Sequence, residues 1–289
     1  MCYHISFEVK LESILDIFPD LVVDPQLKAE FPTSAYVDGF EHKPHPMMIK
    51  SRKDNQRHLA NMVWGFLPDS VSNYEEADKF WNGYRDEHGK WHEGFNTLDA
   101  VGGELFDKVL YREAALKTRG IIFTDGFYEW QHVHPIGKKG NILKTTVTYP
   151  YHIFFPENVN SLTMVAGIWR VWKHYEIDVE TGELKTVFTP TFAMCTTKAN
   201  SKMAEIHNKK ERMPTFLTKE LAEEWLQDGL TQKRITEIAT NQYPEELMDA
   251  YTIPKDFKQI ALPKSKFYYP ELENAVLYRL NNNFYEHNN

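Results

Sequence analysis

The stretch RGIIFTDGFYEW, residues 119–130, decides the fold class that we expect for this chain. Its first half is rich in β-branched and aromatic residues, which is typical of a buried strand. Asp125 then separates this run from an aromatic second half that carries one carboxylate, Glu129. The sequence therefore predicts a strand over Gly120–Thr124 that leads directly into a candidate functional segment, Gly126–Trp130.

Further strands are expected on both sides of this stretch. Runs of the same composition are Thr145–Phe155, Leu162–Trp172 and Val187–Thr196. At the start of the chain, apolar residues alternate with polar ones, which predicts a strand. Cys2 falls among the positions that face the polar side of this strand. The apolar members of this alternation are Ile5, Phe7, Val9 and Leu11. Glu180–Gly182 is expected to be a hairpin tip, and Pro135–Gly140 another loop.

Helices are expected in the last third of the chain. An apolar stripe of Leu221, Trp225 and Leu226 ends near Gly229, a typical helix stop. A last helix is predicted over Glu271–Leu280. Strands in the middle with helices at the flanks predict an α+β architecture.

The length and composition indicate one large domain. A chain of 289 residues with 42% hydrophobic residues can build one large core, although the length also permits two domains. We expect a catalytic domain over residues 1–230 and a helical extension over 231–289 packed on the same domain. No run approaches the roughly 18 apolar residues of a membrane helix, and Met1–Lys10 lacks a signal peptide, so a cytoplasmic protein is expected.

Charge and cysteine content narrow the function. Only two cysteines are present, Cys2 and Cys195, so neither a disulfide framework nor a zinc site is indicated. Cys195 lies in an apolar run and is expected to be an inert core thiol. The net charge of −8 argues against a protein that coats duplex DNA non-specifically, because that mode needs many phosphate contacts.

Cys2 is the first candidate for chemistry. Removal of Met1 would leave an α-amine and a thiol on one residue, a 1,2-aminothiol. In reference peptides these groups titrate at about 8 and 8.5, so both are partly available as nucleophiles at neutral pH. The amine can form a Schiff base with an aldehyde, and the thiol can then close a thiazolidine ring. Taken alone, Cys2 is better explained as a chance occurrence or as a small buried hydrophobe on an ordered terminus.

Three other residues qualify as partners. Glu129 lies between aromatic residues and is a candidate proton shuttle, although a glutamate at a strand end often points outward. His207 precedes a turn that ends at Pro214 and is a candidate acid or base, although most lone histidines are structural. Asn96, in the segment FNTLDA, could donate hydrogen bonds from a loop.

In combination, Cys2, Asn96, Phe127–Trp130 and His207 with Arg212–Pro214 resemble the SOS-response-associated peptidase (SRAP) family, the abasic-site processing proteins. The match runs from Cys2 to about Leu217. Supporting segments are Trp64–Pro68, Gly167–Trp169, Thr196, Thr197, Ala199 and Asn200.

The resemblance implies a barrel-like, mainly antiparallel β core and a groove for single-stranded DNA that contains abasic sites. Cys2 would form the covalent thiazolidine cross-link, Asn96 would orient the amine or sugar, and Glu129 and His207 would transfer protons. Trp64, Phe127, Trp130 and Arg212 would contact DNA, although core packing is expected for at least one of the rings. Autopeptidase and lyase activities are also implied, with no cofactor and a monomeric state.

Two departures from the family pattern weaken the expected DNA contacts. The family continues Cys2 with glycine and arginine, where this chain has Tyr3 and His4. The asparagine segment typically continues with alanine and arginine, where this chain has Thr97 and Leu98, followed by Asp99. A basic rim could compensate, although a solvated charged face explains the same residues. Its members would be Lys50, Arg52, Lys53, Arg57, Lys209 and Lys210.

Two alternative functions stay open. In the first, Cys2 is activated by His207 in a cysteine or N-terminal-nucleophile peptidase that acts on proteins. In the second, the fold is a non-catalytic module that binds single-stranded DNA. No metal site is expected, because the histidine spacings match no standard site. The histidines considered are His42, His45, His92, His132 and His134.

Overall fold

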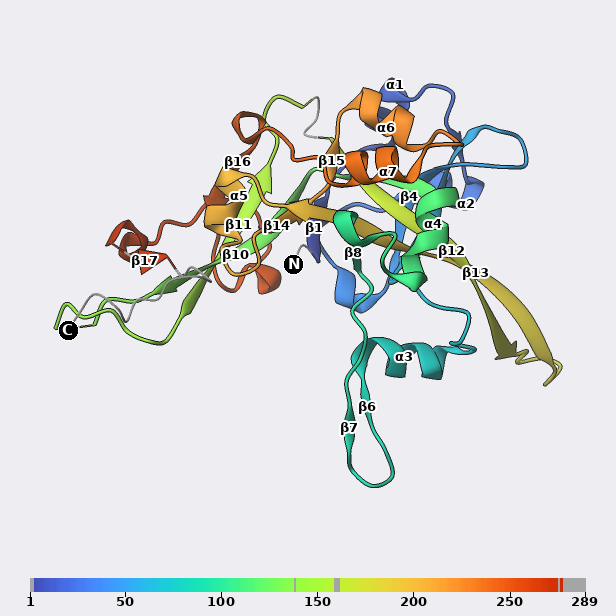
Figure 1. The fold of residues 1–289 in the computed structure, drawn as a ribbon, viewed down its shortest axis with the longest axis horizontal. Helices are drawn as coiled ribbons and strands as arrows, with labels where there is room; N and C mark the ends of the chain where they lie inside the picture. Colours follow the sequence, from blue (N-terminus) through green and yellow to red (C-terminus); the bar gives the residue numbers. More distant parts are fainter. Residues whose placement is uncertain (1–2, 138, 159–161, 275, 278–289) are drawn as a thin grey trace.

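The protein is represented by a computed structural model that describes residues 3–137, 139–158, 162–274 and 276–277. Its centre is a closed five-stranded barrel in which each strand pairs with the next (Figure 1). In order around the barrel, the strands are β13 (Leu184–Lys198), β12 (Thr163–Ile177), β9 (Arg119–Thr124), β4 (Pro44–Lys50) and β5 (Arg57–Trp64). Parallel pairing of β5 with β13 closes the ring. The predicted α+β class with a barrel-like core is confirmed.

A second sheet lies beside the barrel and carries part of the functional site. In order, its strands are β16 (Asp249–Thr252), β11 (Val147–Phe154), β10 (Gly126–His134), β1 (His4–Phe7) and β3 (Ser34–Asp38). The short strand β17 (Val276–Leu277) pairs with the end of β10. The stretch of residues 119–130 therefore crosses between the two sheets. Its first half lies in the barrel as β9, and its second half lies in the second sheet as part of β10.

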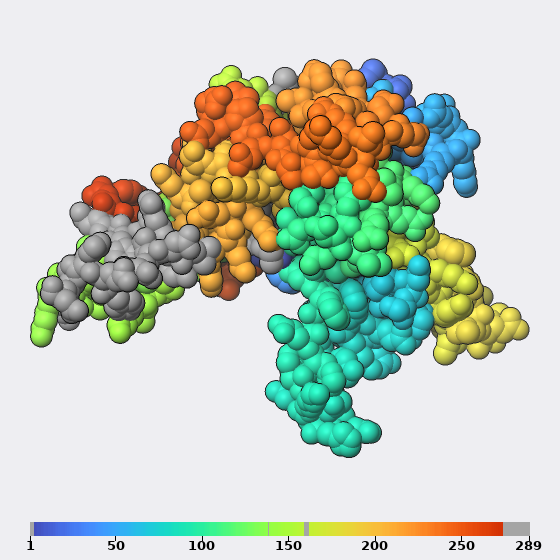
Figure 2. Space-filling model, viewed as in Figure 1, coloured from blue at the N-terminus to red at the C-terminus, as the bar shows by residue number. Residues whose placement is uncertain are grey.

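Helices and short strands complete the described chain. The helices are α1 (Leu11–Ile17), α2 (Pro25–Ala29), α3 (Tyr74–Asn82), α4 (Val109–Lys117), α5 (Ser201–Ile206), α6 (Lys219–Trp225) and α7 (Gln232–Ala239). The short strands are β2 (Val22–Val23), β6 (Tyr84–Arg85), β7 (Trp91–His92), β8 (Asp99–Val101), β14 (Arg212–Pro214) and β15 (Phe216–Leu217). Hairpins project from the body, among them the β6–β7 hairpin with α3, the tip of the β12–β13 hairpin and the far end of the β10–β11 hairpin (Figures 1 and 2).

Two large apolar clusters hold these layers together. One fills the space between the barrel and helices α1, α4, α6 and α7. The other lies between the barrel and the second sheet and includes Ile5, Trp64, Phe127 and Phe192. Burial of these large side chains supplies the main favourable free energy of folding and fixes β1 and β10 against the barrel.

The predicted strands are present with shifted ends, and one helix prediction is wrong. β12 and β13 are longer than predicted, β11 is shorter, and the first strand ends at Phe7, so that Leu11 begins α1. The turn at Glu180–Gly182 joins β12 to β13, as expected. The helix predicted over Glu271–Leu280 is replaced by a 3-10 helix at Pro270–Asn274 and by β17. Pairing with β10 favours the extended conformation of β17, and the remainder of that prediction lies outside the described residues.

Candidate functional site

Two of the predicted site residues meet between β10 and the turn after α5. Glu129 lies in the middle of β10, and His207 directly follows α5. Their side chains are 2% and 5% exposed, and Oε1 of Glu129 lies 3.5 Å from Nδ1 of His207. The structure therefore brings together a buried carboxylate and an imidazole from segments that are far apart in the sequence.

Hydrogen bonds between α5 and β10 explain this alignment. Gln131 donates from Nε2 to the carbonyl of Glu205 at 3.1 Å. Asn208 accepts from the backbone N–H of His132 at 2.9 Å and donates to the carbonyl of His132 at 2.7 Å. At the other end of α5, the Asn200 side chain caps the helix by accepting from the N–H of Met203. The turn that carries His207 is thus fixed on β10 at both of its ends.

The surroundings of His207 define its protonation. Its Nδ1 lies 2.7 Å from the carbonyl oxygen of Arg212, which can only accept, so Nδ1 carries the proton. Burial lowers the pKa of His207, and the nearby carboxylate of Glu129 opposes this shift. In the neutral imidazole the lone pair is then on Nε2. This tautomer is suited to accept a proton.

Glu129 has an unusual hydrogen-bonding state. Its Oε1 is buried and has no hydrogen-bond partner among the described residues. Buried polar atoms are nearly always paired, and an exception calls for a functional explanation such as a catalytic role or a bound ligand. The arrangement can therefore deliver a proton to, or accept one from, a group that enters the site.

Asn96 and Arg212 line a neighbouring cavity of about 520 Å³. Asn96 is exposed, and its side-chain oxygen accepts from the N–H of Leu98 at 3.1 Å. The other wall is aromatic, formed by Phe80 and Phe95, whose rings stack with centroids 5.0 Å apart. Tyr3 also lines this cavity. Cys2 lies outside the described residues, but a peptide bond joins it to Tyr3.

Only one of the three aromatic residues predicted to contact DNA is accessible. Trp64 is 1% exposed and donates from its indole to the carbonyl of Leu98, while Phe127 is completely buried against Phe216. Both rings serve the core between the two sheets, so no base can stack on them in this conformation. Trp130 is partly exposed, and the amine of Lys258 lies 5.9 Å from the centre of its ring.

The expected basic rim is divided, and two of its six members, Lys50 and Arg57, form ion pairs with carboxylates. Lys50 forms an ion pair with Asp228 at 3.2 Å, and Arg57 binds Asp20 at 2.6 Å. Lys50, Arg52 and Lys53 line a separate cavity of about 290 Å³, whereas Lys209 and Lys210 lie on the turn after α5. These cations therefore do not form one continuous surface around Asn96.

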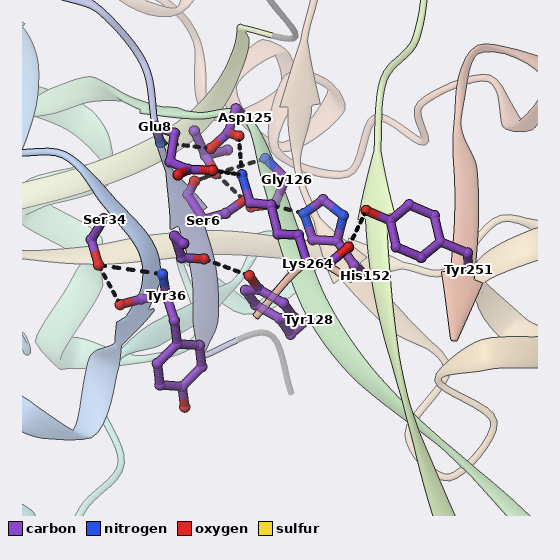
Figure 3. Close-up of polar contacts among 12 residues, drawn as sticks. Ser6, Glu8, Ser34, Tyr36, Asp125, Gly126, Tyr128, His152, Tyr251 and Lys264 are labelled. Carbon is purple, nitrogen blue, oxygen red and sulfur yellow. Dashed lines mark hydrogen bonds and ion pairs between the residues drawn. The ribbon is translucent and has the colours of Figure 1, made fainter. Parts of the chain in front are cut away.

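A polar cluster on the second sheet holds β1 in place (Figure 3). The amine of Lys264 lies between the carboxylates of Asp125 and Glu8, and Asp125 also accepts from the N–H of Glu8 at 2.9 Å. Beside it, Nε2 of His152 lies 3.2 Å from the hydroxyl of Ser6. Burial lowers the pKa of His152 to about 3, and the hydroxyl of Ser6 is inaccessible, so this pair is structural.

The second cysteine matches its prediction. Cys195 is completely buried in β13 and belongs to the large cluster under the helices. Burial raises the pKa of its thiol, which keeps it protonated and unreactive.

The structure also places two residues near the site that the sequence did not mark as candidates. Tyr3 and Asp99 are both buried and hydrogen-bonded to each other. The only local signal was that both lie in the segments that depart from the family pattern. Nothing in their spacing of 96 positions indicates that they meet.

In the described part of the chain, no helix is long and apolar enough to cross a membrane. No group of three or more His, Cys, Asp or Glu side chains there is arranged to hold a metal ion.

Comparisons with known proteins identify relatives of this arrangement. The chain is 24% identical over 237 residues to the abasic site processing protein YoqW of Bacillus subtilis. This alignment covers 82% of this chain and 88% of that protein. It is 25% identical over 197 residues to the abasic site processing protein HMCES of Xenopus tropicalis, covering 62% of this chain and 48% of that protein.

Solved structures and a family model complete the comparison. A crystal structure of a protein from Bacteroides thetaiotaomicron is 26% identical with a TM-score of 0.66, covering 91% of this chain and 97% of that one. A crystal structure of a protein from Bordetella bronchiseptica has 17% identity and a TM-score of 0.59. It covers 88% of this chain and 100% of that one. The model for the family described as SOS response associated peptidase (SRAP) matches residues 1–260. This chain therefore belongs to the SRAP family.

Proposed function

We propose that this protein processes abasic sites in single-stranded DNA by forming a covalent cross-link through Cys2. The observation that carries the proposal is the buried Glu129 oxygen without a hydrogen-bond partner, 3.5 Å from His207. Tyr3, which follows Cys2 in the chain, lines a cavity together with Asn96 and Arg212. The printed names of the Bacillus and Xenopus relatives support the same substrate.

The chemistry needs no cofactor. Opening of the abasic deoxyribose ring exposes an aldehyde, and the α-amine of Cys2 condenses with it to a Schiff base with loss of one water molecule. The thiol then adds across the C=N bond, its proton passing to nitrogen, and a thiazolidine ring closes. Glu129 and the neutral His207 move the protons that ring opening and water loss require.

The same Schiff base explains the further activities implied for the family. Before the thiol adds, a base can remove a proton next to the imine carbon, and strand cleavage by β-elimination follows. Ring closure to the thiazolidine competes with this step and protects the strand. Peptidase activity on its own chain would expose the Cys2 amine by cleaving the bond between Met1 and Cys2.

Intact mass spectrometry tests the proposal. The protein is measured alone and after incubation with a single-stranded oligonucleotide that carries one abasic site. We expect loss of Met1 and a one-to-one adduct whose mass is the sum of both partners minus one water molecule. An oligonucleotide with a tetrahydrofuran analogue, which has no aldehyde, is the matched control and should give no adduct.

Two results would contradict the proposal. Cys2→Ala could form the adduct as well as the parent does, which would exclude Cys2 as the nucleophile. Alternatively, the processed protein could form no adduct at all. Turnover of a peptide in the absence of DNA would then support the peptidase, and DNA binding without an adduct would support the binding module.

A further inference from the structure

Asp99 is a buried carboxylate surrounded by donors. The residue is 8% exposed, and its Oδ1 accepts from the hydroxyl of Tyr3 at 3.0 Å. Its Oδ2 accepts from the hydroxyl of Thr196 at 3.0 Å and lies 3.8 Å from the guanidinium of Arg212. A carboxylate with this many donors is held in one orientation, since each contact restricts the same side chain.

Tyr3 is fixed from three directions. Its hydroxyl donates to Asp99, and its ring packs edge-on against Phe40 with centroids 5.0 Å apart. Its carbonyl accepts from the N–H of Gly39 at 2.8 Å. A Cβ on Gly39 would lie 3.0 Å from this carbonyl oxygen, so glycine permits the close approach. The residue next to Cys2 therefore has little freedom to move.

Arg212 connects this anchor to the acid–base pair. Its guanidinium faces Asp99, while its backbone carbonyl accepts the Nδ1 proton of His207 at 2.7 Å. A chain of contacts thus runs from Tyr3 through Asp99 and Arg212 to His207, with Glu129 beyond it. Both ends of this chain lie where the proposed reaction needs fixed geometry.

We infer that Tyr3 and Asp99 are positioning residues that hold the N-terminal nucleophile in register with His207. The inference rests on the proposed function of Cys2 and deepens it. In this role Tyr3 acts through the backbone that it shares with Cys2, and Asp99 acts through Tyr3 and Arg212. Displacement of a reacting group by about 1 Å can cost on the order of 100-fold in rate, so even a partial loss of this anchor is measurable.

Tyr3→Phe tests the first link. It keeps the ring against Phe40 and removes only the hydroxyl. Single-turnover cross-linking at saturating abasic DNA should be about 10-fold slower, while the final adduct yield and the DNA dissociation constant stay within about 2-fold of the parent. Tyr111→Phe is the matched control, because its hydroxyl bonds the backbone carbonyl of Asp99 at 3.3 Å rather than the carboxylate. Its rate constant should be unchanged within about 2-fold.

Equal rate constants for Tyr3→Phe and the parent would overturn the inference. So would a Tyr3→Phe variant that loses adduct yield but keeps the parental rate constant, because that pattern reports a smaller folded fraction and not misplacement. Thermal unfolding of each variant identifies the second case.

Asp99→Asn tests the second link without DNA. The amide keeps the size of the side chain but removes the charge that faces Arg212. The positive charge of Arg212 lowers the pKa of His207. Without the negative charge of Asp99 beside it, this effect should become stronger, so the pKa of His207 should fall further. The measurement is an NMR titration of the His207 ring, with Tyr111→Phe as control.

An unchanged His207 titration in Asp99→Asn would overturn the coupling through Arg212. Failure of the proposed function is distinguishable from this result. A parental protein that forms no adduct would refute the role of Cys2, while the titration still decides whether Asp99 acts on His207.

Discussion

Glu129 and Asp99 are both buried carboxylates, yet their surroundings are opposite. Oε1 of Glu129 has no hydrogen-bond partner in the described chain and lies 3.5 Å from an imidazole with a lowered pKa. Asp99 receives two hydroxyl hydrogen bonds and faces a guanidinium. The same functional group therefore has two different environments in this protein. In our proposal the carboxylate with the unpaired oxygen exchanges protons with the substrate, and the hydrogen-bonded one fixes the geometry around it.

The largest effect is expected from Glu129→Gln. A lost proton shuttle typically costs 10²–10⁴-fold, so we expect the cross-linking rate constant to fall by about 100-fold or more. The free energy of unfolding should not decrease, because the variant removes a buried charge that lacks a full set of partners. Single-turnover kinetics and chemical denaturation measure the two quantities. A variant that cross-links normally would remove Glu129 from the mechanism.

Asp99→Ala should instead lower the free energy of unfolding. It leaves the buried hydroxyls of Tyr3 and Thr196 without their acceptor, and each unsatisfied group costs about 1–3 kcal/mol. We expect the free energy of unfolding to fall by roughly 3 kcal/mol. Urea denaturation measures this loss. Equal stability of Asp99→Ala and Glu129→Gln would show that the two carboxylates do not differ as argued.

Thr196→Val sharpens the comparison with a smaller change. Valine has nearly the volume of threonine but lacks the hydroxyl donor, and the variant leaves Tyr3 and Arg212 in contact with Asp99. The expected cost is about 1 kcal/mol of unfolding free energy, with little change in cross-linking rate. A loss as large as that of Asp99→Ala would mean that Thr196, and not the carboxylate, organises this side of the site.

The smallest expected effect concerns the titration of His207. Since the Glu129 carboxylate raises the pKa of His207 against the effect of burial, Glu129→Gln should lower that pKa further. NMR titration of the ring measures this, and an upward shift would contradict the assigned contact. A histidine with a lowered pKa favours the folded state above its unfolded value of 6.5. This contribution to stability is lost as the pH falls from there toward the folded pKa.

The parts of the fold that the sequence predicts are those with strong local patterns. The β-branched runs identify β9, β11, β12 and β13, because β9 is buried throughout and each of the others contains buried segments within its length. The helix predicted at the end of the chain fails because an apolar pattern of that length is also compatible with a strand, and pairing with β10 decides between them.

For the site, too, the sequence predicts which residues belong together better than how they are packed. Family resemblance identified Glu129 and His207, and the structure places them together. Exposure is a property of the assembled layers, so the sequence could not show that Trp64 and Phe127 are core residues while Trp130 is accessible. The contact between Tyr3 and Asp99 depends on the path of the chain around the barrel and has no local signature. The division of the chain at residue 230 stays a prediction.

The pairing of β1 with β10 sets an order of events during synthesis. Ile5 pairs with Phe127, so β1 cannot take its final place until Phe127 has left the ribosome. At roughly 5–20 residues per second, this delay is on the order of 10 s. β3 is made earlier, but two paired strands alone are only marginally stable. β1 and the neighbouring Tyr3 therefore stay without their β10 partner throughout this interval and are accessible to the factors that act on nascent chains.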